Sequence, residues 1–224
     1  NKVDFEYAKE SLKNVELLPL PTVEFKKRDK SLIRKDLGLD KFDYIVAAHG
    51  LLNKHKNIPE IIKAVSQLKK DKVKALFLSL SAVSPNNIYA QGVYEECVNL
   101  VKSEGMENNV VLIKNFLDDA DIEVLMQTVD ATIFAYDDVG ESASASIRKS
   151  LASGGVTIVS DINMFQEFKD EVLKLPTPSA KEIYNTIKLV RENNQLKDRL
   201  LAAAKKYVHE NTYDKRAVEM LMMY

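Results

Sequence analysis

Continuous apolar runs alternate along this chain with segments in which apolar residues recur at helical spacing. A run such as 43–49 (DYIVAAH) has the length and the apolar content of a fully buried strand. The next segment, 58–70, places a set of apolar residues on one face of a helix, namely Ile58, Ile61, Ile62, Val65 and Leu68. Buried strands joined by amphipathic helices predict an α/β domain with a doubly wound, Rossmann-like parallel sheet.

The same alternation continues to the C-terminal end of the chain. We expect further strands at 73–81, 109–114, 130–136, 156–160 and 172–175, and helices at 26–40, 89–105, 120–128, near 165, and at 179–192, 195–209 and 214–223. Segment 14–21 (NVELLPLP) is predicted to be a short strand or a hinge, because two prolines close it. No internal repeat or low-complexity linker interrupts the pattern. We therefore interpret 1–224 as one domain, with a hinge segment at 1–21 and a terminal helix at 210–224.

The stretch from 137 to 160 has the small residues that a ligand-binding loop needs. Glu141 precedes Ser142, Ala143 and Ser144, and the two serines are expected to cap a helix that Gly154-Gly155 ends. Backbone N–H groups and the dipole at the start of a helix favour a phosphate. The alternative is an ordinary strand-to-helix connection that binds nothing.

A second loop, 49–57 (HGLLNKHKN), carries basic residues at the end of a strand. Gly50 follows the strand directly, and Lys54, His55 and Lys56 come just before a helix. A lysine held there can act as a point charge on a pyrophosphate, although solvated loop lysines are the common alternative. Since ligands of open α/β sheets bind beyond the carboxyl ends of the strands, loops 49–57, 79–87 and 137–144 are expected side by side.

Composition narrows the class of protein. The net charge of −1 gives no electrostatic footprint for nucleic acid. A disulfide framework is excluded because Cys97 is the only cysteine, and its helical context indicates a core residue. No apolar run approaches the roughly 20 residues that cross a bilayer, so no transmembrane segment is predicted. Because the chain begins at Asn1 rather than Met, we expect it to be a piece of something longer.

Acidic pairs raise the question of a metal site. Asp118 and Asp119 are interpreted as acids at a helix N-terminus, and Asp137 and Asp138 as loop residues. Magnesium and manganese sites need carboxylates that converge in space. We therefore expect neither a metal nor a cofactor.

Three stretches, in register over nearly the whole chain, resemble a known family. These are HGLLNKHKNIPEIIKAV, NVVLIKNFLDDADIEVLMQTVDATIFAY and ESASASIRKSLASGGVTIVSD. They resemble the C-terminal, donor-binding domain of the bacterial members of family 4, the retaining glycosyltransferases of GT-B architecture. The resemblance implies that this chain is one half of a two-domain enzyme.

The resemblance assigns roles to individual residues. Gly50 and Lys56 match the glycine and the lysine that contact the donor diphosphate, and Glu141 matches a catalytic glutamate at the donor sugar hydroxyls. The other implied donor-binding positions supply backbone N–H groups to the diphosphate or flank the nucleobase and ribose: Ser142, Ala143, Ser144, Lys114, Asn115 and Lys149.

Two positions depart from the family's pattern. Leu51 stands where an arginine usually follows the glycine, and Lys149 stands where a second glutamate usually binds the ribose. A lysine has no acceptor for two hydroxyls, so ribose recognition must change, the donor must differ, or activity is lost.

The implied reaction is transfer of a sugar from a UDP- or GDP-linked donor to a glycan, lipid or other acceptor, as in polysaccharide biosynthesis, with retention of configuration and without a metal. The acceptor would bind the N-terminal domain that this chain lacks, so the isolated fragment is expected to be inactive. The location implied is the cytoplasm, either free or peripherally at the inner face of the membrane.

Two other functions stay open. One is a non-catalytic nucleotide-binding or interaction module, which Leu51 and Lys149 favour. The other is a sugar-nucleotide epimerase of the same architecture, which would need further acid/base groups beside the donor. A nicotinamide-dependent dehydrogenase is disfavoured because no G-x-G-x-x-G follows the first strand.

Overall fold

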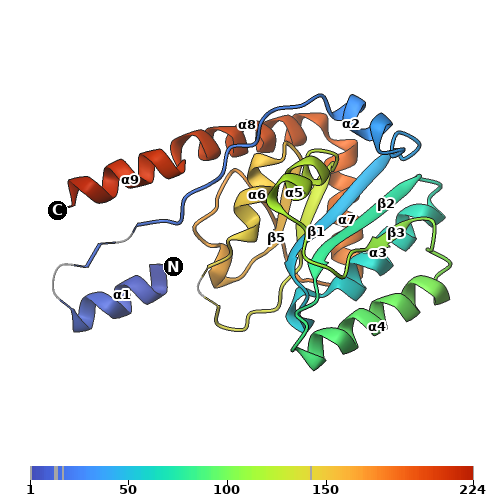
Figure 1. Cartoon of the computed structure of the whole chain (residues 1–224), viewed down its shortest axis with the longest axis horizontal. Coiled ribbons are helices and arrows are strands. Elements are labelled where there is room, and N and C mark those ends of the chain that lie inside the picture. Colours follow the sequence, from blue (N-terminus) through green and yellow to red (C-terminus); the bar gives the residue numbers. More distant parts are fainter. Residues whose placement is uncertain (1, 13–14, 17, 142, 224) are drawn as a thin grey trace.

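The computed structural model describes residues 2–12, 15–16, 18–141 and 143–223. Its centre is a six-stranded, wholly parallel sheet in the order β3-β2-β1-β4-β5-β6 (Figure 1). The strands are β1 (Tyr44–Leu51), β2 (Ala75–Ala82), β3 (Val110–Leu112), β4 (Ala131–Phe134), β5 (Val156–Ser160) and β6 (Leu173–Leu175). The predicted doubly wound, Rossmann-like sheet is confirmed.

Helices cover both faces of this sheet. The described helices, of which α1 and α9 lie away from the sheet (Figure 1), are α1 (Lys2–Ser11), α2 (Lys30–Asp36), η1 (Lys54–Lys56), α3 (Ile58–Lys70), α4 (Ile88–Ser103), α5 (Asp119–Met126), α6 (Ser146–Ala152), η2 (Asn163–Phe165), α7 (Ala180–Glu192), α8 (Asn194–Glu210) and α9 (Tyr213–Met222). In β1, Val46 and Ala48 pack with α3, α4 and α7, whereas Ile45 and Ala47 pack with α5. Successive side chains of a strand point to opposite faces, so a strand that is apolar throughout belongs between two helical layers.

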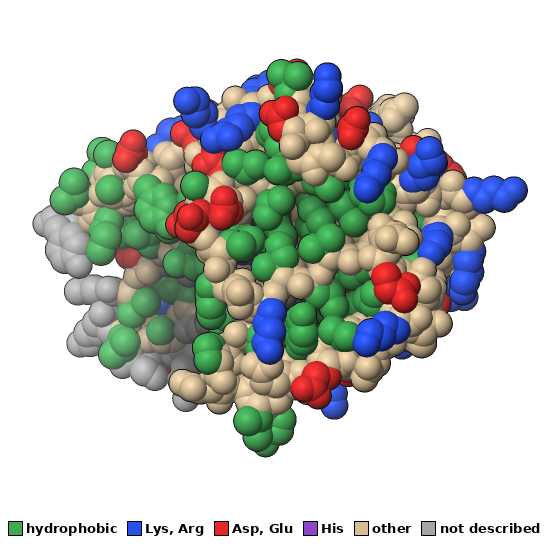
Figure 2. All heavy atoms as spheres, turned by 45° about the vertical axis from the view of Figure 1, so that its right-hand side comes forward, with side chains coloured by type: hydrophobic (Ala, Val, Ile, Leu, Met, Phe, Trp, Pro, Cys, Tyr) green, Lys and Arg blue, Asp and Glu red, His purple; other side chains and the backbone are tan. Residues whose placement is uncertain are grey.

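Helices α6 and α8 complete the second layer over β4 and β5. Phe134 and Val159 of these strands share an apolar cluster with Ile147 of α6 and with Ala204 and Val208 of α8. Figure 2 shows hydrophobic side chains in the middle of one face of the molecule, with positive and negative side chains interspersed around them. This mixed surface agrees with the net charge of −1.

The strand order fixes where a ligand can bind. From β1 the chain moves outward through β2 to β3, and it then returns to the other side of β1 to build β4, β5 and β6. The loops that leave β1 and β4 therefore turn in opposite directions and open a crevice at the carboxyl edge of the sheet. Ligands of open α/β sheets bind at such a switch point.

Capping residues set most of the helix starts that the sequence predicted. Asp118 accepts a hydrogen bond from the backbone N–H of Asp121 and begins α5, which confirms its interpretation as a helix N-terminal acid. Cys97 is buried in α4, as expected for a core residue. Helix α2 is shorter than the predicted 26–40, because Asp29 caps it and the chain turns at Gly38.

Segment 14–21 was predicted to be a short strand or a hinge, and its described residues form no strand. The described part of 14–21 pairs with no strand, and the only bridge nearby joins Thr22 to Thr212. Helix α1, which the sequence pattern did not predict, precedes this segment (Figure 1). At the other end, α9 extends beyond the sheet and buries none of its residues. Its exposed apolar side chains include Val218, Leu221 and Met222.

Candidate functional site

Gly50, Lys56 and Ser146 converge at the switch point between β1 and β4. A Cβ atom placed on Gly50 would lie 2.7 Å from Ser146 Oγ and 3.0 Å from Lys56 Nζ. Gly50 also has φ of +126°, a backbone conformation that L side chains rarely adopt. Glycine at this position therefore lets the Lys56 ammonium group and the Ser146 hydroxyl group come close to the backbone of β1.

Lys56 is the central cation of this space. It lies in η1, is only 8% exposed, and has its Nζ 5.2 Å from the centre of the Tyr136 ring. Among the described residues, no carboxylate lies within ion-pairing distance of it. Burial lowers the pKa of Lys56 to about 8, and the negative charge of Glu141 only partly offsets this. A buried lysine without a partner is costly in the unliganded protein and favours an anionic ligand.

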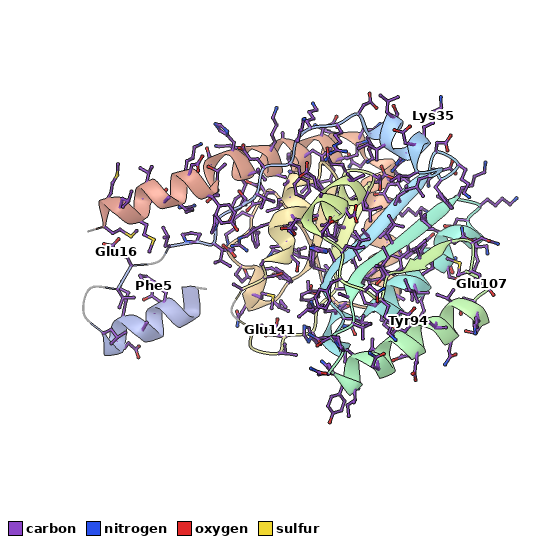
Figure 3. The ribbon with its side chains drawn as sticks, viewed as in Figure 1. Phe5, Glu16, Lys35, Tyr94, Glu107 and Glu141 are labelled. Atoms are coloured by element: carbon purple, nitrogen blue, oxygen red, sulfur yellow. The ribbon has the colours of Figure 1, made fainter. Side chains whose placement is uncertain are left out.

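Glu141 lies on the loop between β4 and α6, beside His55. Its Oε1 is 3.7 Å from His55 Nε2, which is beyond hydrogen-bonding distance. Figure 3 shows Glu141 on the opposite side of the molecule from Lys35 and Glu107, which precede β1 and β3. Glu141 therefore lies at the carboxyl edge of the sheet, where the sequence placed it.

His55 and Tyr136 leave polar atoms unused next to Lys56. Their rings meet edge to face with centroids 5.5 Å apart. His55 Nε2 and Tyr136 OH are both buried, and neither has a hydrogen-bond partner in the described part of the chain. Burial lowers the pKa of His55 and raises the pKa of Tyr136. Unsatisfied buried atoms are expected to find partners in a ligand or in water.

The prediction that Ser142 or Ser144 caps the central helix is wrong, because the N-cap residue is Ala145. Helix α6 begins at Ser146, and its N-cap residue Ala145 makes no side-chain capping bond. Ser144 precedes the helix as buried coil and Ala143 as exposed coil, while Ser142 lies outside the described residues. The first-turn N–H groups of α6 thus belong to the segment that begins at Ser146, whose Oγ comes close to Gly50.

Arg148 explains why the chain stays non-helical up to Ala145. Its guanidinium donates hydrogen bonds to Ser144 O at 2.7 Å, to Leu20 O at 3.0 Å and to Glu167 Oε1 at 2.8 Å. Arg148 is 3% exposed and covers the ring of Phe168. It ties loop 137–144 to the hinge segment 1–21. Sequence reasoning missed this role, because its partners lie far away in the chain.

Lys114, Asn115 and Lys149 lie at the same edge but apart from Lys56. Lys114 and Asn115 are exposed after β3, and Lys114 Nζ lies 5.3 Å from the centre of the Tyr94 ring. Lys149 forms an ion pair with Asp119 of α5. In the described ranges, no hydrogen bond or ion pair joins any of these three residues to Lys56 or Glu141.

A separate cavity of about 540 Å³ lies between residues 24–30, the C-terminal end of α6 and α8. Its walls include Phe25, Leu151 and Val208, and none of the predicted site residues lines it. Over the described ranges, no group of three or more His, Cys, Asp or Glu side chains is arranged to hold a metal ion. None of the described helices is long and apolar enough to cross a membrane.

Comparison with known proteins identifies the family. A family model described as "Glycosyl transferases group 1" matches residues 29–207. The chain belongs to this glycosyltransferase family. The match covers the sheet, η1 and the loop of Glu141. No curated protein sequence matches this glycosyltransferase domain.

Several solved structures share the fold. The C-terminal domain of a glycosyl transferase group 1 family protein (LpcC) from Francisella tularensis has a TM-score of 0.69 and 16% identity, and the match covers 84% of this chain and 96% of that one. HepE from Anabaena, in complex with UDP, has a TM-score of 0.74 and 17% identity, and the match covers 90% of this chain and 54% of HepE. Sucrose-phosphate synthase from Thermosynechococcus elongatus has a TM-score of 0.76 and 16% identity, and the match covers 99% of this chain and 55% of the synthase.

The solved structures differ in how much of their own length the chain matches. The chain spans nearly the whole length of the isolated Francisella domain but only about half the length of HepE and of the synthase. The similarity therefore agrees with the predicted C-terminal half of a GT-B glycosyltransferase.

Proposed function

We propose that this domain binds the nucleoside-diphosphate sugar donor of a glycosyltransferase, and that Lys56 binds the diphosphate. The observation that carries the proposal is the buried Lys56, which has no described carboxylate partner and whose Nζ comes close to Gly50 beside Ser146. The Anabaena HepE was solved with UDP and, separately, with UDP-glucose. A uridine-diphosphate sugar is therefore the first donor to test, with a GDP-linked sugar as the second.

The chemistry of sugar transfer suits these residues. Departure of a nucleoside diphosphate leaves negative charge on the diphosphate and develops positive charge on the sugar ring. Lys56 and the N–H groups near Ser146 stabilise the leaving group without a metal. Glu141 orients the sugar hydroxyls and stabilises the positive charge, and we propose that the configuration is retained.

The full-length enzyme would contain an N-terminal domain that holds the acceptor, a glycan or a lipid. Helix α9 would pack against that domain, since it buries none of its own residues here. The isolated chain would bind donor and transfer little or no sugar. The proposed location is the cytoplasm, with peripheral contact to the inner face of the membrane for a lipid acceptor.

One observation favours a second candidate, a non-catalytic nucleotide-binding module. Leu51 and Lys149 replace two polar residues of the family's donor site, and Leu51 is largely exposed at the end of β1. In that case Glu141→Gln in the full-length protein would leave any activity unchanged.

The test is a calorimetric titration of the domain with UDP, GDP, ADP, dTDP and UDP-glucose. We expect one nucleotide to bind, and Lys56→Ala to weaken it at least tenfold, as the loss of about 1.5–3 kcal/mol from a charged hydrogen bond implies. Lys54→Ala is the matched control, because Lys54 is an exposed lysine of the same turn. Glu141→Gln should weaken UDP-glucose but not UDP. Binding that is indifferent to Lys56 would refute the proposal.

A further inference from the structure

The cavity of about 540 Å³ between residues 24–30, α6 and α8 is not used by the proposed function. It lies at the amino edge of the sheet, because its walls include Ser153 and Gly154, which come just before β5. Glu141 follows β4 and lies at the opposite, carboxyl edge. The volume is in the range of about 300–1,000 Å³ that is typical of small-molecule sites.

The cavity is elongated along α8. The residues of α8 that line it share one face of the helix, at the spacing i, i+3, i+4, i+7 and i+8: Leu201, Ala204, Lys205, Val208 and His209. Over this stretch the helix rises by about 12 Å. Segment 24–30 forms a second wall and follows Thr22, whose Oγ1 donates a hydrogen bond of 3.0 Å to the carbonyl oxygen of Val208 (Figure 1). A slot between two elongated segments suits a linear ligand.

The interior of the cavity favours an apolar ligand. Besides the residues of α8, its apolar lining comes from Phe25, Leu151 and Ala152. The uncharged polar side chains of the lining already have partners within the protein: Gln127 accepts a hydrogen bond from the backbone N–H of Arg28, and Ser153 donates one to the carbonyl oxygen of Ser150. A hydroxylated ligand would lose its hydrogen bonds to water here, whereas a hydrocarbon chain gains by leaving water.

Three exposed cations line the same cavity, namely Lys27, Arg28 and Lys205. Among the described residues, no carboxylate forms an ion pair with any of them. This local excess is not a general property of the surface, since the whole chain has a net charge of −1. The stems of lysine and arginine pack along apolar surface while their charged ends reach water, where an anionic group would meet them.

The other charged residues of the lining leave this positive charge in place. Lys30 is neutralised by Asp130, whose Oδ1 lies 2.7 Å from its Nζ. Glu24 is the only acid of the lining in the described part of the chain, and its Oε1 lies 3.9 Å from His209 Nδ1. A single carboxylate faces three cations, so the complementary ligand is an anion.

We propose that this cavity binds one amphipathic anion, an unbranched acyl chain that lies along α8 with its carboxylate or phosphate group at Lys27, Arg28 and Lys205. The inference goes beyond the proposed function, because the cavity and the donor site lie at opposite edges of the sheet. Such a ligand is either a free fatty acid or one chain of an anionic lipid in a bilayer, and both have the same chemistry.

The experiment is a calorimetric titration of the chain with decanoate and decyl phosphate, below the concentrations at which they form micelles. We expect each to bind at one site, and decyltrimethylammonium, which has the same chain and a positive head group, to bind at least tenfold more weakly. Octanoate should bind more weakly than decanoate by about fourfold for each methylene group removed, as burial of the chain implies.

Two variants separate the head group from the chain. Lys205→Glu should weaken decanoate at least tenfold, whereas Lys206→Glu is the matched control, because Lys206 is the adjacent exposed lysine of α8 and does not line the cavity. Ala204→Leu should weaken decanoate by filling the slot, and the exposed Ala202→Leu should not. Thermal unfolding checks that each variant is folded. Because Lys205 is exposed, its replacement tests the inference without disturbing the core.

Decanoate binding that is the same in Lys205→Glu and Ala204→Leu as in the wild type overturns the inference, as does equally tight binding of decyltrimethylammonium. Vesicles containing phosphatidylglycerol distinguish the two sources of the ligand. Sedimentation with them that Lys205→Glu abolishes and Lys206→Glu retains supports a bilayer lipid, whereas binding of decanoate alone supports a free fatty acid. Lys205→Glu should leave the affinity for UDP unchanged, so failure of this inference and failure of the proposed function are separate results.

Discussion

Ser146 Oγ lies where a side chain on Gly50 would begin, because a Cβ atom on Gly50 would come within 2.7 Å of it. The end of β1 and the start of α6 are therefore in contact through the one residue that leaves room for both. This close approach brings Lys56 next to the first turn of α6. It also makes the site sensitive to the addition of a single methyl group at Gly50.

Gly50→Ala should destabilise the domain by about 1–3 kcal/mol, because it adds a clash and a strained φ at the same residue. It should also weaken nucleotide binding, since the new methyl group occupies the space beside Lys56. Thermal unfolding and calorimetry measure the two effects. Gly38→Ala is the control, because Gly38 shares the positive φ but has no neighbouring atom within 4 Å. It should cost stability without changing binding, and equal binding losses in both variants would contradict the steric account.

Lys56→Met should stabilise the unliganded domain at pH 7 by roughly 1–3 kcal/mol. The pKa of Lys56 is about 8 in the fold and 10.5 in the reference state, so the folded protein holds fewer protons between these values. The penalty for the buried charge is therefore complete below pH 8 and is relieved as the pH rises toward 10.5. Urea unfolding should show that Lys56→Met adds less to the free energy of unfolding at pH 10 than at pH 7. A variant that is less stable than the wild type at pH 7 would contradict the conclusion that burial of the charged lysine destabilises the fold.

Nucleotide affinity should fall as the pH rises above 8. A lysine whose pKa is about 8 loses its charge there, so the dissociation constant should be about tenfold larger at pH 9 than at pH 7. Titrations from pH 7 to pH 9.5 measure this slope. Lys54→Met should keep the slope and Lys56→Met should abolish it. If the dissociation constant of Lys56→Met still rose with pH, the titration of another group would be responsible.

Arg148→Met should destabilise the domain by about 2–4 kcal/mol, because it removes three hydrogen bonds from a buried guanidinium and leaves Glu167 unpaired. Nucleotide binding should weaken as well, since the carbonyl group of Ser144 loses its anchor. Chemical denaturation and calorimetry measure both. Arg199→Met, at an exposed position of α8, should stay within about 0.5 kcal/mol of the wild type. A similarly small effect at Arg148 would rule out its anchoring role.

The fold could be predicted from the sequence because its signal is periodic and local. Strands such as β1 are buried on both faces and therefore apolar throughout, and helix α3 carries its apolar residues on one side. Because Lys56 follows a strand and precedes a helix in the sequence, its location at the carboxyl edge of the sheet could also be predicted. That the lysine is buried could not be predicted, because its burial depends on Tyr136 and on α6, which come from other parts of the chain.

The start of α6 shows where local reasoning fails. The serines before it are good capping residues, yet the helix begins only at Ser146, because Arg148 binds the carbonyl oxygen of Ser144 and connects it to Leu20 and Glu167. Capping preferences are worth about 1 kcal/mol. Three hydrogen bonds from a buried guanidinium outweigh them.

The sequence by itself determined the order and type of the elements, the parallel sheet, and the edge at which we propose that a ligand binds. Tertiary structure alone decided which side chains meet at that edge: Gly50 with Ser146, Lys56 with Tyr136, and Lys149 with Asp119. The physical reason is that periodicity records which face of each element is buried. Contacts between residues far apart in the chain arise only when the crossovers bring separate loops to the same side of the sheet.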